Sequence, residues 1–229
     1  MQLLGLLAQR NPTQIVTPLI RRVTLPQPDL LLKAQWNSAL SLELQSDWFV
    51  HYLCHWVSSY NLVMRKNPDR LAELRRQLIL DSSPEKAYDD ITKLLSESLD
   101  VPIALIIFMD ADRNWSKSSV GFPLAAVPIE TSFCESFFKS DKNVIVVPDT
   151  LESEQFRQHP LVIGEPQVRF YASARLVVND QTLGTLCAFD TRPRQLLPEQ
   201  MDHLKALTQA VVELLQSRTK VSEQLLLAT

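Results

Sequence analysis

The chain has 229 residues and a formal net charge of -3. This balance gives no general attraction to phosphate backbones or anionic lipid, so neither nucleic acid nor a membrane surface is an expected partner. Three widely spaced cysteines without a CxxC pair argue against a disulfide framework and a structural zinc site, and they indicate a reducing compartment. No apolar run is long enough to span a membrane, so we expect a cytoplasmic protein. We expect neither a metal nor a cofactor.

The N-terminal part of the sequence divides into two segments. Repeated proline prevents a long helix in residues 1–30, which we expect to form an irregular arm. Apolar and aromatic residues then recur at helical spacing over 31–66, which predicts a helical region that could bind a partner. Within it, His51, Cys54 and His55 could share one helix face and hold a metal ion, although packing of an apolar helix explains them better.

Two helix starts are predicted after this region. Asn67 followed by Pro68 is typical of a capped helix, which we expect to form a linker over 67–82. The Ser-Pro-Glu triplet at 83–85 predicts the next helix start, because Ser can cap, Pro fits the first position and Glu suits the positive end of the helix dipole. Apolar residues continue at helical spacing as far as Leu99.

The pattern then changes from helix to strand. Val101 to Met109 is apolar on both alternating faces, as expected for a central strand that is covered on both sides. Asp149 with Glu152 resembles a capping box for a short helix, and Asn179-Asp180 predicts a turn between two strands. The order of elements predicts an α+β fold with an antiparallel sheet and one helical face. The predicted strands cover 101–109, 115–120, 144–147, 169–178 and 183–190.

A long helix is predicted after Pro198, with apolar residues at three-four spacing and Arg218 in the one polar position of the seam. Such a seam is how helices pair, so we expect a helix-mediated homodimer; a long covering helix with a frayed tail over 219–229 is the alternative. The expected interface residues are Leu71, Leu74, Leu78, Leu204, Leu207, Val211 and Leu214.

Six short sequence stretches, in their order and spacing, resemble the GAF domain family. They are ILDSSPEKAYDDI (79–91), VPIALIIFMDADRNW (101–115), SFC (132–134), VVPDT (146–150), HPLVIGEPQVRFYA (159–172) and LGTLCAFD (183–190). The resemblance covers about 70–218, with the domain itself placed at 83–218, and leaves the N-terminal extension unrecognised. It implies an antiparallel sheet with helices on one face, which commonly dimerise, and a loop-roofed pocket on the other.

The resemblance and the strand pattern together give candidates for the pocket. Arg169, Tyr171, Ser173 and Arg175 alternate on one face of their strand. Two arginines on the pocket side would favour an anionic ligand, whereas the alternative is that these side chains tie down loops. The ligand-binding candidates are Arg113, Trp115, Cys134, Phe137, Arg169, Tyr171, Ser173, Arg175 and Thr185.

Three departures from the family pattern lie near the expected pocket. Glu135-Ser136 follows SFC where the family often has Ala-His, and Ser173-Ala174-Arg175 stands where Gly-Ala-Pro is common. Ser116 occupies the place of a bulky aromatic residue. The identity of a ligand is therefore not carried over, and a bilin chromophore is not expected, because Cys134 is followed by Glu rather than His.

The cysteines and acidic residues of the domain allow two interpretations each. Cys134 could have a lowered thiol pKa at a helix start, or could be a small buried hydrophobe. Cys187 is expected in the core, which leaves Cys134 without a second thiol to resolve a sulfenic acid. Three aspartates that follow strands are expected to cap turns, with a cation site as the alternative. They are Asp110, Asp149 and Asp190.

The resemblance implies a non-catalytic sensory module of bacterial signal transduction. It would bind a small ligand, such as a cyclic nucleotide, or a protein partner, and would signal through its helices. One alternative is a pure interaction protein whose pocket is filled by its own side chains. A second is an enzyme similar to GAF-type free methionine sulfoxide reductases, against which the missing second thiol argues.

Overall fold

The computed structural model describes residues 64–123, 129 and 132–227. The predicted arm over 1–30, most of the helical region over 31–66, and the group of His51, Cys54 and His55 lie outside the described residues.

In the described part of the chain, five antiparallel strands form one sheet in the order β2-β1-β5-β4-β3. All residues of β1 are buried, as the apolar pattern of this segment predicts. The predicted antiparallel sheet and α+β class are thus confirmed, with strand ends shifted by no more than two residues. The strands are β1 Ile103–Met109, β2 Asn114–Val120, β3 Val144–Val147, β4 Phe170–Val178 and β5 Gln181–Asp190.

The predicted turn between β4 and β5 is a two-residue hairpin. Asn179 and Asp180 have φ values of 49° and 60°, and Val178 pairs with Gln181. Two consecutive residues with positive φ match the right-handed twist of the flanking strands, and Asn and Asp tolerate this conformation better than most residues. The turn therefore sets the strand register next to the hairpin, and the register shifts by one residue between Leu176 and Val177.

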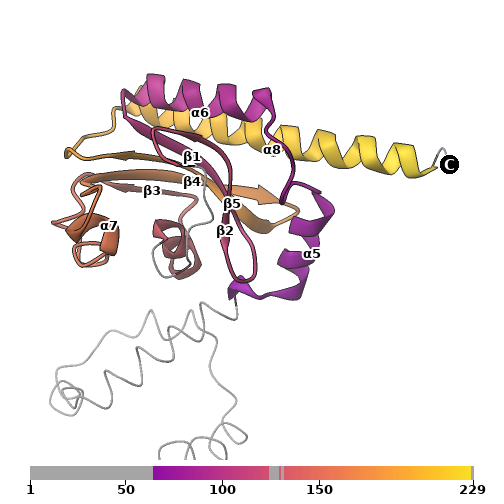
Figure 1. Ribbon diagram of the computed structural model, residues 1–229, viewed down its shortest axis with the longest axis horizontal. Coiled ribbons are helices and arrows are strands. Elements are labelled where there is room, and N and C mark those ends of the chain that lie inside the picture. The colour runs from indigo at the N-terminus through magenta and orange to yellow at the C-terminus, as the bar shows by residue number, and fades with distance from the viewer. Residues whose placement is uncertain (1–63, 124–128, 130–131, 228–229) are drawn as a thin grey trace, which may run out of the picture. The chain divides into compact units, whose positions relative to one another are not determined.

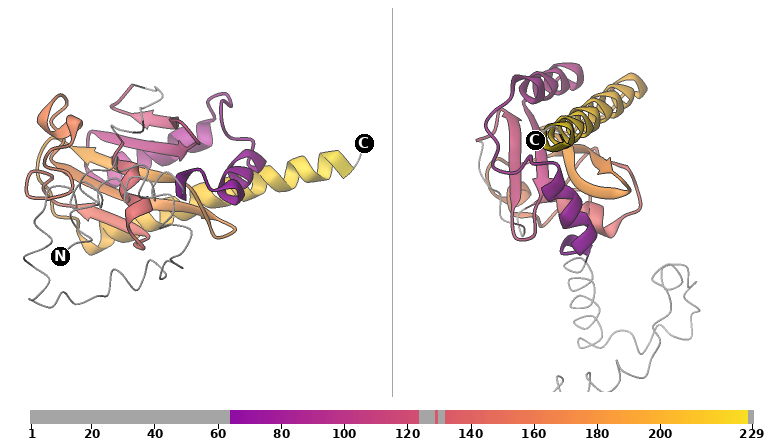
Figure 2. Two further views of the ribbon diagram at one scale, coloured as in Figure 1. Left: turned by 90° about the horizontal axis from the view of Figure 1, so that it is seen from below. Right: turned by 90° about the vertical axis from the view of Figure 1, so that its right-hand side faces the viewer.

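Two helices cover one face of the sheet. α6 spans Lys86–Leu99 and α8 spans Pro198–Leu227, and they lie side by side across the strands (Figures 1 and 2). α8 has 30 residues against 14 in α6, and its C-terminal part continues beyond the sheet (Figure 1). Among the described residues, no helix is both long and apolar enough to cross a lipid bilayer.

The sheet separates two apolar cores, and alternation along the strands assigns residues to them. Ala104, Ile106 and Phe108 of β1 face the helices, where they pack with residues such as Leu95. The intervening β1 residues, such as Leu105, face the opposite core, beneath the short helices η2 (Phe133–Lys139) and α7 (Pro160–Ile163). One face of the sheet therefore packs against α6 and α8, and the other face carries the candidate site.

The linker helix is shorter than predicted. α5 spans Pro68–Arg76, and the Asn67 side chain accepts hydrogen bonds from the first-turn backbone N–H groups, as the Asn-Pro pair indicates. The helix does not reach residue 82, because Leu78 adopts a left-handed φ of 50° and the chain turns there. α5 packs against β5 at one end of the sheet.

The predicted start of α6 at Ser83 is wrong. The helix begins at Lys86, and its extended N-cap residue, Glu85, makes no capping bond with its side chain. The preceding residues bind Lys117 of β2 instead: its Nζ donates to Ser82 Oγ at 2.7 Å and to the Ser83 carbonyl at 2.6 Å. A tertiary contact from the sheet thus replaces the local cap.

The predicted helix after Asp149 is also wrong. Residues 150–157 form turns rather than a helix. Arg157 N donates to Ser153 O, a single hydrogen bond of helical spacing. Asp149 still accepts a bond from Leu151 N, but both of its carboxylate oxygens also bind Arg169. A helix, α7, begins only at Pro160 and ends at Ile163.

Several residues predicted at a dimer interface are instead part of the core. Leu74, Leu204 and Val211 have no exposed surface within a single chain and Leu71 is 8% exposed, so these four pack inside the domain. The prediction was wrong because apolar residues at three-four spacing on these helices pack against the sheet of the same chain. Leu207 and Leu214 are partly buried beside this core, and Leu78 is exposed.

Candidate functional site

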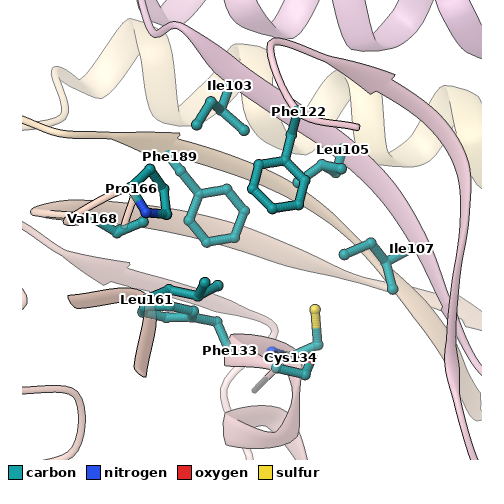
Figure 3. Close-up of a pocket in the computed structure, with 11 residues that line it drawn as sticks. Ile103, Leu105, Ile107, Phe122, Phe133, Cys134, Leu161, Pro166, Val168 and Phe189 are labelled. Atoms are coloured by element: carbon teal, nitrogen blue, oxygen red, sulfur yellow. Dashed lines mark hydrogen bonds between the residues drawn. The ribbon is translucent and has the colours of Figure 1, made fainter. Parts of the chain in front are cut away.

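A small cavity lies between the sheet and the segments that roof it, η2 (Phe133–Lys139) and α7. Its volume is about 40 Å³, and its walls are almost entirely apolar (Figure 3). Ligand pockets usually measure about 300–1,000 Å³, so this cavity has room for only one or two molecules the size of water. It is lined by Ile103, Leu105, Ile107, Phe122, Ser132, Phe133, Cys134, Leu161, Pro166, Val168 and Phe189.

Aromatic side chains fill the space where a pocket is expected. The Phe133 ring lies 4.9 Å from that of Phe156, 5.0 Å from that of Tyr171 and 5.4 Å from that of Phe189, measured between centroids. The His159 ring is 4.0 Å from the Phe133 ring, and its Nδ1 accepts the Leu161 N–H. Burial lowers the pKa of His159, which favours the neutral ring in this apolar cluster.

Beside the cavity is a compact group of thiols and hydroxyls. The Sγ atoms of Cys134 and Cys187 are 3.7 Å apart, and Thr185 Oγ1 lies 3.1 Å from the first and 2.9 Å from the second. Ser173 Oγ is 3.2 Å from Cys187 Sγ and donates to the Leu186 carbonyl. The expectation that Cys134 has no second thiol within reach is therefore wrong. Of the predicted ligand-binding residues in the described chain, Cys134 is the one that lines the cavity.

Tyr171 and Phe137 lie on the pocket side but are covered by other residues. Tyr171 is fully buried, and its hydroxyl makes no hydrogen bond of ordinary geometry, nor does the nearby buried Ser136 hydroxyl. Burial raises the pKa of Tyr171 well above its ordinary value. Phe137 is 2% exposed and lies under the Arg175 guanidinium, 5.2 Å from the ring centroid.

Arg169, just before β4, and Arg175, within β4, both bind other groups of the domain. Arg169 binds Asp149 through two bonds of 2.8 and 2.5 Å. Arg175 donates to the backbone carbonyls of Phe137, at 2.8 Å, and Ser140. Each arginine therefore ties a loop to the sheet, and neither lines the cavity, so the case for an anionic ligand loses its basis.

Arg113 and Trp115 lie away from the cavity. Arg113 binds Asp81 at 2.5 Å and Asp110 at 3.5 Å in an exposed turn. Trp115 packs on the helix side of the sheet, with its ring 6.3 Å from that of Phe108. Both predictions placed these residues on the wrong part of the domain.

The three aspartates that follow strands each accept a backbone N–H of the next turn. The donors are Ala111, Leu151 and Arg192 for Asp110, Asp149 and Asp190 respectively. Each aspartate also binds an arginine side chain. In the described part of the chain, no group of three or more His, Cys, Asp or Glu residues is placed to hold a metal ion.

The Asp149–Arg169 pair predicts a pH dependence of stability. The hydrogen bonds of Arg169 hold the pKa of Asp149 below its ordinary value, so the pair stabilises the fold above about pH 4, and this contribution is lost as the pH falls through the lowered value. We expect Asp149→Asn to lower Tm by about 2–4 °C at pH 7. Thermal melts from pH 7 to pH 3 should show the two curves converging in acid.

A matched control is Asp202→Asn, since Asp202 makes an exposed ion pair with Lys205 at 3.4 Å. This variant should melt with the wild type throughout. A constant difference between Asp149→Asn and the wild type down to pH 3 would show that the carboxylate charge is not responsible.

Three charged residues that the sequence did not single out are central to the architecture around the site. Arg65 binds Glu135 of η2 and the Arg113 carbonyl, and Arg70 binds the carbonyls of Arg65, Met109 and Thr182. Both arginines are at least 97% buried. The available signal was two arginines flanking the Asn-Pro helix start, which does not reveal such distant partners. The third, Lys117, lies in a polar strand that gives no sign of burial.

Comparison with known proteins agrees with this architecture. The GAF domain model matches residues 83–215, which is more than half of the chain. A cyclic di-GMP phosphodiesterase of Pseudomonas aeruginosa is 32% identical over 150 residues, covering 63% of this chain and 25% of that protein. The chain thus spans about a quarter of the length of this curated relative.

Solved structures of GAF domains are similar to this chain at low sequence identity. The GAF domain of an Acinetobacter phosphoenolpyruvate-protein phosphotransferase superposes with a TM-score of 0.51 at 14% identity, covering 68% of this chain and 97% of that one. The blue-light absorbing form of the Thermosynechococcus elongatus PixJ GAF domain gives a TM-score of 0.48 at 18% identity, covering 69% and 95%. With the sheet order, the helical face and the family match over 83–215 in agreement, the chain belongs to the GAF domain family.

Proposed function

We propose that the chain is a non-catalytic regulatory module of signal transduction that acts through protein contacts of helix α8, in a homodimer. The observation that carries this proposal is an apolar stripe on α8. Leu207, Leu214 and Val221 recur every seven residues; the first two are partly buried and Val221 is 56% exposed. A seven-residue apolar repeat is the pattern by which two helices pair in a coiled coil.

The size of the cavity supports protein contacts over binding of a small molecule. A cyclic nucleotide needs several times the volume of about 40 Å³ found here. The arginines that could hold a phosphate are bound to Asp149 and to backbone carbonyls. This arrangement favours the interpretation in which the protein's own side chains fill the pocket.

The similarity to a phosphodiesterase is compatible with a regulatory role. The match covers a quarter of that protein, so most of its length has no counterpart in this chain. We infer that the shared part regulates rather than cleaves, in this chain and by the same helix-mediated contacts. A rise in Tm on addition of cyclic di-GMP would contradict the filled pocket, because only a ligand of the folded state stabilises it.

Native mass spectrometry of the full chain tests the dimer. We expect a dimer at micromolar concentration, and a rise in dissociation constant of about tenfold or more for Val221→Glu, because a charge replaces an apolar side chain at the seam. Gln216→Glu is the matched control, since residue 216 is exposed on another side of the same helix and gains the same charge.

The control should dimerise as the wild type does. A monomeric wild-type chain at these concentrations would contradict the proposal. A dimer that Val221→Glu leaves intact would show that another surface holds the copies together.

A further inference from the structure

The two thiols beside the cavity are arranged so that one can react with a small molecule and the other can follow. Cys134 lines the cavity at the start of η2, with its sulfur directed toward Ile107 and Leu105 (Figure 3). Cys187, on β5, does not line the cavity but lies 3.7 Å from Cys134, measured between sulfur atoms. Both cysteines are free and buried.

The cavity restricts what can reach Cys134. About 40 Å³ with apolar walls admits a neutral molecule of two heavy atoms, whereas a charged or larger oxidant would have to lose its hydration or displace the aromatic cluster. Methionine sulfoxide is too large for this space. Hydrogen peroxide is small and uncharged, and it is therefore the class of oxidant that fits.

Access to the cavity assigns the two sulfurs different roles, because Cys134 lines it and Cys187 does not. The contact between the two thiols lowers the pKa of Cys134, and burial raises the pKa of Cys187 well above its ordinary value. The thiolate is the reactive form, so Cys134 is the thiol prepared to attack. Thr185 Oγ1 lies within 3.1 Å of both sulfurs and can pass a proton between them.

We propose that Cys134 and Cys187 form a dithiol site that hydrogen peroxide oxidises to an intramolecular disulfide. The Cys134 sulfur attacks one peroxide oxygen, forming an S–O bond and breaking the O–O bond; the released hydroxide takes a proton and leaves as water. Cys187 then attacks the sulfur of the resulting sulfenic acid, forming the S–S bond and releasing a second water. Two thiols thus lose two electrons and two protons, and one peroxide is reduced.

The disulfide requires a modest movement of the roof. The sulfurs must approach by about 1.7 Å to reach bonding distance. Cys187 belongs to a strand with neighbours on both sides, whereas Cys134 starts a single short helix, so η2 is the part that moves. Glu135, the next residue, is bound to Arg65, and the movement is therefore transmitted to the segment that enters the domain.

The test treats the folded full-length chain with about 1 mM hydrogen peroxide, then unfolds it, alkylates free thiols and digests it with trypsin. The three cysteines fall in separate tryptic peptides, 34–65, 118–139 and 176–194, so each pairing gives a distinct mass. We expect peptides 118–139 and 176–194 to be linked, with a loss of about 2 Da in the intact chain, equal to two hydrogen atoms.

Variants separate the roles of the two sulfurs. In Cys187→Ser, peroxide should leave a sulfenic acid on Cys134, which dimedone captures when the treated chain is unfolded in its presence. In Cys134→Ser, Cys187 should remain a free thiol. Cys54→Ser is the control and should form the same disulfide as the wild type. Full recovery of Cys134 and Cys187 as alkylated thiols from the peroxide-treated wild-type chain, or linkage of either to Cys54, would overturn the proposal even if a variant fails to fold.

Discussion

Gly184→Ala is expected to destabilise the fold strongly. Gly184 lies in β5, where it pairs with Phe108 of β1 on one side and Leu176 of β4 on the other. An added Cβ would lie 2.1 Å from the Ile107 carbonyl oxygen, a backbone atom that cannot rotate away. Relief requires β1 and β5 to separate in the middle of the sheet. We expect a loss of more than about 3 kcal/mol, a large part of an ordinary stability of about 5–15 kcal/mol.

Urea unfolding followed by circular dichroism measures this effect. Gly164→Ala is the matched control, because the same methyl group there meets one carbonyl, that of Pro160, at 3.0 Å in an exposed loop. The control should lose less than about 1 kcal/mol. Equal unfolding midpoints for the two variants would show that the strands adjust more easily than their close approach implies.

Arg70→Ala is expected to destabilise the domain by about 2–4 kcal/mol and to release α5 from the sheet. The Arg70 guanidinium, in a residue that is 3% exposed, donates to the carbonyls of Arg65, Met109 and Thr182. Its loss leaves three carbonyls buried without this donor. Burial lowers the pKa of Arg70 to about 10, which records the cost of enclosing the charge.

Urea titration with hydrogen exchange at residues 68–76 separates global from local effects. Arg75→Ala, on the exposed side of the same helix, is the control and should change stability by less than about 0.5 kcal/mol. Unchanged exchange protection of α5 in Arg70→Ala would show that apolar packing alone holds the helix.

The strands were predictable because their signals are local. An unbroken apolar run such as Val101 to Met109 can only be satisfied by cover on both faces, and Asn179-Asp180 favours the backbone of its hairpin. Helix starts were less predictable where a distant side chain competes with a cap. Lys117 binds the Ser83 carbonyl, and no feature within that segment reveals it.

For a similar reason, alternation along the sequence could not show which β2 residues lie on which face of the sheet. Ile106 pairs with Ser118 but Ile107 pairs with Ser116, so Lys117 is an extra residue that breaks the alternation. Trp115 therefore faces the helices, although simple counting gave no such indication. A bulge depends on the partner strand, and the sequence of one strand does not encode it.

The site itself was predictable only in part. Alternation along β4 correctly grouped Tyr171 with Ser173 on one face, but what each side chain binds depends on segments far away in the chain. Cys134 and Cys187 are 53 residues apart and meet only because η2 lies over the middle of β5. Contacts of this kind follow from topology and register rather than from local pattern.

The C-terminal part of α8 extends beyond the domain, and its direction depends on the contacts near Leu215. From Leu215, which has no exposed surface, to Leu227 the helix advances about 18 Å. Near this pivot, Thr219 donates to the Gln77 side chain, and Arg218 binds Glu85 and the Leu78 carbonyl. A tilt of about 10° would displace the tip by about 3 Å. A shift of residues 77–85, which these bonds join to α8, would therefore change the direction of its C-terminal end.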